Sequence, residues 1–370
     1  MESEQITEQI TEQTPVDDRP RLPYLPAADA LKFWLMPFVC FLCFGFPSRY
    51  GGNIAALSGF APLCFYILCG FFTLTGESDE RHRLKKGIRR SGKTFAILFA
   101  VCLAVNALMY ILRGVSPLAL FKALTTRRQL FNFFVLSAWP FAMGESIWFI
   151  QSLLYAYLFL WLLDVLHLRR LRWVLLALCT ALMLASGELA VLVRFHFLGA
   201  PYLPPNVFTR ALPYLLLGAL LRRNRERLRA VKAWVYLLMV PAGLALAYGE
   251  FELLARYNLL ITTSHAVGLG LAAFGLCAWV LLFLDIDAPG FFCIAGRPAA
   301  RGVYLLSQPV AFLMIVPLAS LAPGLAMYVQ ALGGIAVYPV CLALALLFDT
   351  IIANDKQINR MGRQASEAQI

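Results

Sequence analysis

Ten apolar segments of membrane-spanning length dominate this chain of 370 residues and leave it few possible folds. They cover residues 30–47, 55–75, 94–112, 147–166, 173–192, 208–221, 234–254, 263–284, 302–321 and 327–352. A helix needs about 20 apolar residues to cross the hydrocarbon core of a bilayer. The chain is 60% hydrophobic and 14% charged, whereas a soluble domain is about half apolar and a quarter charged. We therefore predict an all-α, polytopic membrane helical bundle of about ten transmembrane helices.

The chain divides into one membrane domain and two tails. Residues 1–29 are rich in Glu, Gln and Thr and end in three prolines, a composition that predicts a disordered tail. Residues 30–352 form the predicted ten-helix domain, and residues 353–370 form a second tail. The apolar piece Phe131–Phe141 is too short to span, and we interpret it as a re-entrant or interfacial segment.

The net charge of +11 is explained by topology. With the N-terminus in the cytoplasm, 23 of the 32 lysines and arginines fall in cytoplasmic segments and 7 in outer loops. Because cytoplasmic loops carry the excess of positive charge, we predict that both termini are cytoplasmic and that the protein is multi-pass in the cell membrane (plasma or inner). Membrane lipid is then the partner of this charge, and we expect no nucleic acid.

Signatures of soluble enzymes are missing from the sequence. There is no Walker loop, no dinucleotide-binding glycine loop, no HExxH motif and no GxSxG motif. The nine cysteines lie mostly in apolar segments and are predicted to be small buried side chains. Neither they nor the four histidines have metal-ligand spacing, so we predict no metal site.

A few charged residues near the membrane are candidates for chemistry. Glu145 maps to the outer end of a span, where it is either solvated or lines an outward cavity as a base. The stretch Arg81–Lys93 holds seven basic residues. These either contact lipid phosphates or hold the phosphates of a nucleotide-like donor, because guanidinium groups pair well with phosphate oxygens.

Four short motifs follow one another in a recognisable order. They are Ala61–Phe71, Trp148–Tyr157, Arg210–Gly218 and Val303–Leu306. With ten spans and both ends inside, they resemble the acyltransferase-3 family of membrane acyltransferases over residues 28–352.

The resemblance implies a bundle that moves an acyl group, usually acetyl, from acyl-CoA to a hydroxyl of an envelope glycan or an exported small molecule. The family has an Arg or Lys in its first span, followed eleven positions later by a His that acts as base or acyl carrier. Lys32 matches the cation, which contacts the donor phosphates in the family. The donor contacts expected here are Lys32, Lys86, Arg89, Arg90 and Lys93, and the expected substrate-cavity residues are Trp148, Tyr304, Ser307 and Gln308.

The chain departs from the family motif at Cys43, which stands where the family has histidine. A buried thiol is a poor base, but a thiol can carry an acyl group as a thioester. Lys32 is eleven residues away, about 16 Å along a helix, so it does not activate Cys43 directly. The candidate catalytic residues are Cys43, Glu145 and His265, the last as a base from the outer side.

Two other readings stay open. In the first, a relative has lost the acyl chemistry and transports or senses a small polar solute. In the second, the chain is an unrelated ten-span transporter.

Overall fold

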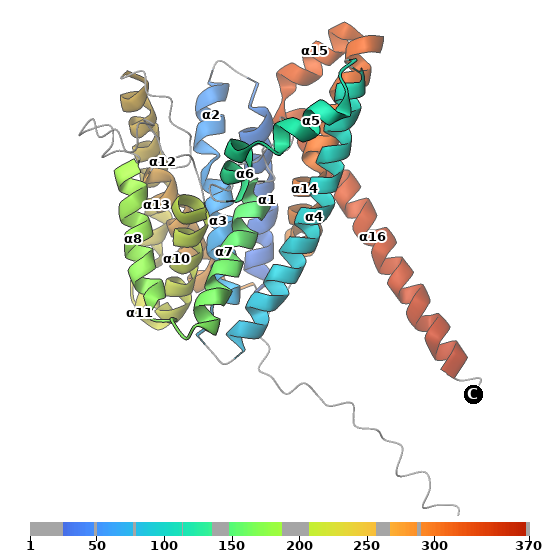
Figure 1. The fold of residues 1–370 in the computed structure, drawn as a ribbon. Helices are drawn as coiled ribbons and strands as arrows, with labels where there is room; N and C mark the ends of the chain where they lie inside the picture. Colours follow the sequence, from blue (N-terminus) through green and yellow to red (C-terminus); the bar gives the residue numbers. More distant parts are fainter. Residues whose placement is uncertain are drawn as a thin grey trace, which may run out of the picture.

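The computed structural model describes residues 25–47, 50–76, 79–112, 114–134, 148–186, 207–256, 267–286 and 290–367. Within these ranges the chain is helical and has no strand. Long helices stand side by side and run alternately up and down (Figure 1). The all-α bundle predicted from the sequence is confirmed.

The long helices are α1 (Pro26–Phe44), α3 (Phe60–Thr73), α4 (Glu80–Leu112), α7 (Trp148–Val165), α8 (Leu171–Ser186), α10 (Leu212–Arg223), α12 (Ala233–Arg256), α13 (Val267–Phe283), α14 (Phe291–Leu321) and α16 (Gly334–Glu367). The shorter ones are α2 (Gly51–Leu57), α5 (Pro117–Leu124), α6 (Arg127–Phe134), the π-helical turn η3 (Val207–Ala211), α11 (Arg225–Arg229) and α15 (Pro323–Leu332). Each of the ten predicted segments overlaps one of these helices or two consecutive ones.

Six helical segments are long and apolar enough to cross a membrane. They are Pro26–Phe44, Gly51–Thr73, Glu80–Leu108, Trp148–Val165, Ala233–Leu253 and Gly334–Ile351. Two shorter helices are also apolar, over Leu171–Leu184 and Val267–Phe283. Large apolar side chains such as Trp234, Leu238 and Leu347 are exposed on the outer helices, as expected for a surface that faces lipid. The chain is a membrane protein, and the full count of ten crossings stays a prediction.

The helix ends differ from the predicted boundaries in three places. Helix α1 begins at Pro26, inside the predicted disordered tail, because proline suits the first turn of a helix and Ala27, Ala28 and Asp29 are buried. The basic stretch predicted as a loop forms the first half of α4. The tenth predicted segment is broken at Gly333, whose φ of +51° favours glycine, and α16 then continues to Glu367. Residues 1–24 lie outside the described part.

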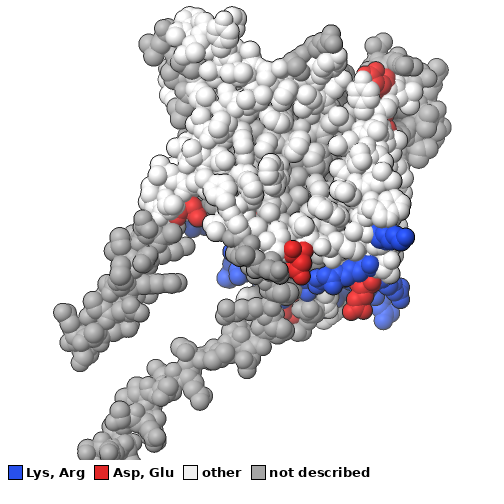
Figure 2. All heavy atoms as spheres, turned by 180° about the vertical axis from the view of Figure 1, so that it is seen from behind, with Lys and Arg blue, Asp and Glu red and all other residues white. Residues whose placement is uncertain are grey.

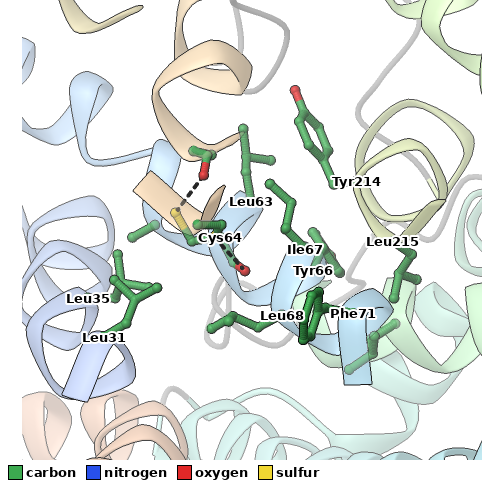
Figure 3. Close-up of a cluster of buried hydrophobic side chains, with 14 of the residues drawn as sticks. Leu31, Leu35, Leu63, Cys64, Tyr66, Ile67, Leu68, Phe71, Tyr214 and Leu215 are labelled. Atoms are coloured by element: carbon green, nitrogen blue, oxygen red, sulfur yellow. Dashed lines mark hydrogen bonds between the residues drawn. The ribbon is translucent and has the colours of Figure 1, made fainter. Parts of the chain in front are cut away.

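Helix α3 is the centre of the core. Figure 3 shows Leu31 and Leu35 of α1 on one side of it and Tyr214 and Leu215 of α10 on the other. The Cys64 thiol donates to the carbonyl of Ala273 at 3.8 Å, which ties α3 to α13. Seven of the nine cysteines are buried, as predicted from their apolar surroundings.

Helices α3 and α10 cross at very short range through two glycines. A Cβ atom on Gly70 would lie 1.9 Å from the Leu215 carbonyl oxygen, and one on Gly218 would lie 2.1 Å from the Ile67 carbonyl oxygen. Small residues allow such approaches between membrane helices. Both glycines belong to motifs that carry the family resemblance, so these two motifs form one helix contact.

Positive charge gathers at one end of the bundle. In Figure 2 the lysines and arginines visible on this face lie at its lower end, while most of the upper surface is uncharged. The first half of α4, α11 and the first turns of α1 and α14 are at this lower end (Figure 1). We call it the basic end.

Candidate functional site

The first group of predicted residues lies at the basic end and is organised around Asp29. The ammonium group of Lys32 donates to the Asp29 carboxylate at 2.7 Å, and Nε of Arg297 donates to the same carboxylate at 2.8 Å. Asp29 is buried, so a cation from α1 and one from α14 share a single negative charge. The three residues together keep a net charge of +1, which remains able to attract an anion.

The predicted donor contacts on α4 are all exposed. Lys86 and Lys93 are seven positions apart, and the adjacent Arg89 and Arg90 lie three or four positions from each of them, which places all four on one side of the helix. Gly87, three positions before Arg90, packs against α7, because a Cβ there would lie 3.0 Å from Cε2 of Tyr157.

A small polar group lies at the basic end, where α3 ends. The Tyr157 hydroxyl of α7 is 3.3 Å from Oγ1 of Thr73. The ammonium group of Lys32 on α1 is 6.0 Å from the centroid of the Phe72 ring, in the same turn of α3 as Thr73. We define the basic site as Lys32, Arg90, Thr73 and Tyr157. Four helices, α1, α3, α4 and α7, contribute to it.

A buried ion-pair network supports the same end of the bundle. Arg172, at the start of α8, pairs with Glu80 at the start of α4, and its Nη2 is 3.9 Å from Asp164 at the end of α7. Asp164 also accepts from Arg169, and this contact raises the pKa of the Arg169 guanidinium. Both carboxylate side chains are 1% exposed. The network joins three helices through the buried charges of Glu80, Asp164 and Arg172, while Arg169 is 47% exposed.

A second group of predicted residues meets inside the bundle, around Phe149. The ring centroid of Phe149 is 6.3 Å from that of Trp148 and 5.6 Å from that of Tyr304. Tyr66 of α3 packs on the same ring at 4.4 Å and donates its hydroxyl to the Phe149 carbonyl at 3.3 Å. The structure therefore brings together Trp148 and Tyr304, which were predicted to line a substrate cavity from opposite ends of the sequence.

The sequence reasoning missed Arg210, which belongs to this interior group. Its Cζ atom lies 4.2 Å from the centroid of the Trp148 ring. It is near the start of the predicted segment 208–221, in η3, at the opposite end of the η3–α10 unit from the basic end. Pro213 explains the π-helical turn, because it has no N–H to offer the Thr209 carbonyl and its ring crowds that carbonyl. The available signal was one arginine within an apolar segment.

The other predicted site residues are placed as follows. Cys43 is half-buried near the end of α1, and its thiol lies within electrostatic range of the Tyr304 hydroxyl. Ser307 is fully buried and donates to the Tyr304 carbonyl at 3.4 Å. Glu145, His265 and the side chain of Gln308 lie outside the described residues.

The segment predicted to be re-entrant is partly described. Phe133, in α6, packs against Phe95 and Phe99 of α4. Its carbonyl accepts from Nε2 of Gln151 at 2.9 Å and from the Tyr155 hydroxyl at 3.3 Å. Helix α6 therefore contacts the first turns of α7 in the bundle, and residues 135–141 lie outside the described part.

No protein-family model, no curated protein and no solved structure matches this chain. The resemblance to the acyltransferase-3 family thus rests on the sequence motifs, and its functional content remains a prediction.

Proposed function

We propose that this chain is an integral membrane acyltransferase of the cell membrane, with ten crossings and both termini in the cytoplasm. The donor is acyl-CoA, with acetyl the expected acyl group, and the acceptor is a hydroxyl of an envelope glycan or an exported small molecule. The observation that carries the proposal is the gathering of cations from two different helices, Lys32 of α1 beside α3 and the exposed Arg90 of α4 beside α7, at the basic end.

The basic site suits the charge of such a donor. The phosphates of CoA carry several negative charges, and guanidinium and ammonium groups bind phosphate through charge-assisted hydrogen bonds. The exposed cations of α4 provide the approach, and Lys32 and Arg90 belong to two helices, α1 and α4, that both contact α3. The positive-inside rule places this end in the cytoplasm, where acyl-CoA is made.

The reaction itself balances simply. The acceptor hydroxyl attacks the thioester carbonyl, the carbon–sulfur bond breaks, and the hydroxyl proton ends on the CoA thiolate. A base accepts that proton first, and Glu145 and His265 are the candidates. In the covalent variant, Cys43 takes the acyl group as a thioester before the acceptor attacks.

Calorimetry with purified full-length protein and acyl-CoA tests the proposal. The unmodified chain is expected to bind acyl-CoA. Arg90→Gln and Lys32→Gln are each expected to weaken binding about tenfold, the equivalent of one charge-assisted hydrogen bond. Arg227→Gln, an exposed arginine of α11 outside the predicted donor contacts, is the matched control and should bind as the parent does. Failure to bind acyl-CoA of any chain length contradicts the proposal.

The alternative function is transport or sensing of a small polar solute by a bundle that has lost acyl chemistry. It is favoured by Arg210, a cation in the bundle interior. Cys43→Ala distinguishes it from the thioester route, because the substitution abolishes acyl transfer through Cys43 but leaves solute binding unchanged.

A further inference from the structure

Arg210 lies in the apolar part of the bundle, with its Nε atom buried and the side chain as a whole partly exposed. Arg222, at the basic end of α10, follows it by twelve residues, which is about 18 Å along a helix. An extended arginine side chain cannot cover that distance, so Arg210 does not reach the basic end. A charge at such a depth costs several kcal/mol unless something compensates it, and intramembrane arginines mark ligand or ion pathways.

The protein compensates this charge only in part. The guanidinium remains protonated in proteins and offers five N–H donors. Stacking on Trp148 stabilises the cation by about 2 kcal/mol when the pair is desolvated, but an indole ring accepts no ordinary hydrogen bond. Across the described residues no carboxylate forms an ion pair with Arg210, and its buried Nε has no hydrogen-bond partner.

A second unsatisfied donor belongs to the same group. The Tyr304 hydroxyl oxygen is buried and makes no hydrogen bond within the described part of the chain. The Tyr304 ring packs on Phe149, the neighbour of Trp148 in the chain. Buried polar groups nearly always form hydrogen bonds. Two buried donors without a partner, Arg210 Nε and the Tyr304 hydroxyl, therefore indicate that a hydrogen-bond acceptor binds near this aromatic group.

We propose that Arg210, whose guanidinium stacks on Trp148, binds the carboxylate of a small organic acid inside the bundle. The guanidinium group can donate two parallel hydrogen bonds to the two oxygens of a carboxylate. Its single positive charge also balances the single negative charge of a carboxylate, whereas a phosphate dianion would keep one charge unpaired. The rings of Trp148, Phe149 and Tyr66 give the ligand an apolar or ring-shaped body to pack against. The proposal does not rest on acyl-CoA binding, and it applies equally to an acceptor and to a transported solute.

Calorimetry on the full-length protein in detergent, with acetate, lactate and benzoate as probes, tests the proposal. At least one carboxylate is expected to bind, while benzamide, the neutral analogue of benzoate, binds at least tenfold more weakly. Arg210→Gln is expected to lose at least tenfold in affinity for the carboxylate. Arg210→Lys keeps the positive charge but loses the paired N–H donors of the guanidinium, so its affinity should lie between those of the parent and Arg210→Gln. Arg223→Gln is the matched control, because Arg223 also stacks on a tryptophan, Trp173 at 5.3 Å, but is exposed.

A stability measurement separates binding from a structural role. Because Arg210 forms no ion pair with a described carboxylate, Arg210→Met is expected to melt no lower than the parent in the absence of ligand. A carboxylate that raises the melting temperature of the parent should not raise that of the variant. The proposal is overturned if no carboxylate binds, if benzamide matches benzoate, if methyl phosphate binds better than the carboxylates, or if Arg210→Gln keeps the parent affinity. None of these results alters the acyl-CoA test at the basic end.

Discussion

Replacing Arg172 by methionine is expected to lower the free energy of unfolding by about 3–5 kcal/mol, the usual cost of removing one partner from a buried ion pair. The side chains of Glu80 and Asp164 are both 1% exposed and both face this guanidinium. Without it, Glu80 loses its buried ion-pair partner, and among the described residues the remaining hydrogen bond to its carboxylate is the one from the backbone N–H of Gly76 at 2.7 Å. Thermal unfolding in detergent micelles should show a large drop in melting temperature.

A double variant shows whether the loss of stability comes from the unpaired charge of Glu80. Arg172→Met with Glu80→Gln removes both members of the pair, so part of the lost stability should return, since a neutral amide is cheaper to bury than a carboxylate. Arg81→Met is the control on the same helix as Glu80. It removes an exposed cation, and a change above about 1 kcal/mol there would mean that charge on α4, not burial, governs stability.

The helical bundle could be predicted from the sequence because each apolar segment carries its own signal. A run of about 20 apolar residues excludes nearly every fold but a membrane helix, and no knowledge of its neighbours is needed. Boundaries were harder. The polar stretch Glu80–Lys93 was taken as a loop because its charges exclude it from lipid, yet charge does not prevent a helix in water, and α4 starts at Glu80.

The site was less predictable because its residues meet only in three dimensions. The motifs located Trp148 and Tyr304, but nothing in the sequence placed both against Phe149. Arg210 was missed since a cation near a segment end is usually solvated, and only the packing of η3 against α7 shows that it is enclosed. Arg172 was counted only as a charge that orients the protein, although it also pairs with buried carboxylates.

Gly218→Ala is expected to destabilise the bundle by about 1–3 kcal/mol, the cost of overpacking a tight contact. The added Cβ would lie 2.1 Å from the Ile67 carbonyl oxygen and 2.8 Å from the Phe71 amide nitrogen. Both are backbone atoms of α3, so no side chain can rotate away and the two helices must separate. The larger Gly218→Leu should prevent folding, seen as loss of monodisperse protein in size-exclusion chromatography.

Gly249→Ala is the matched control and should change stability in the opposite direction. Gly249 is exposed in α12, and a Cβ there meets no atom within 4 Å. Replacing a helix-interior glycine by alanine without a clash stabilises the folded state by about 0.5–1 kcal/mol, because glycine loses more backbone entropy on folding. Opposite signs at the two positions identify the α3–α10 crossing as the cause. If Gly218→Ala also stabilises the protein, the two helices are not in close contact, and the neighbouring η3 turn would no longer be held against α3 and α7.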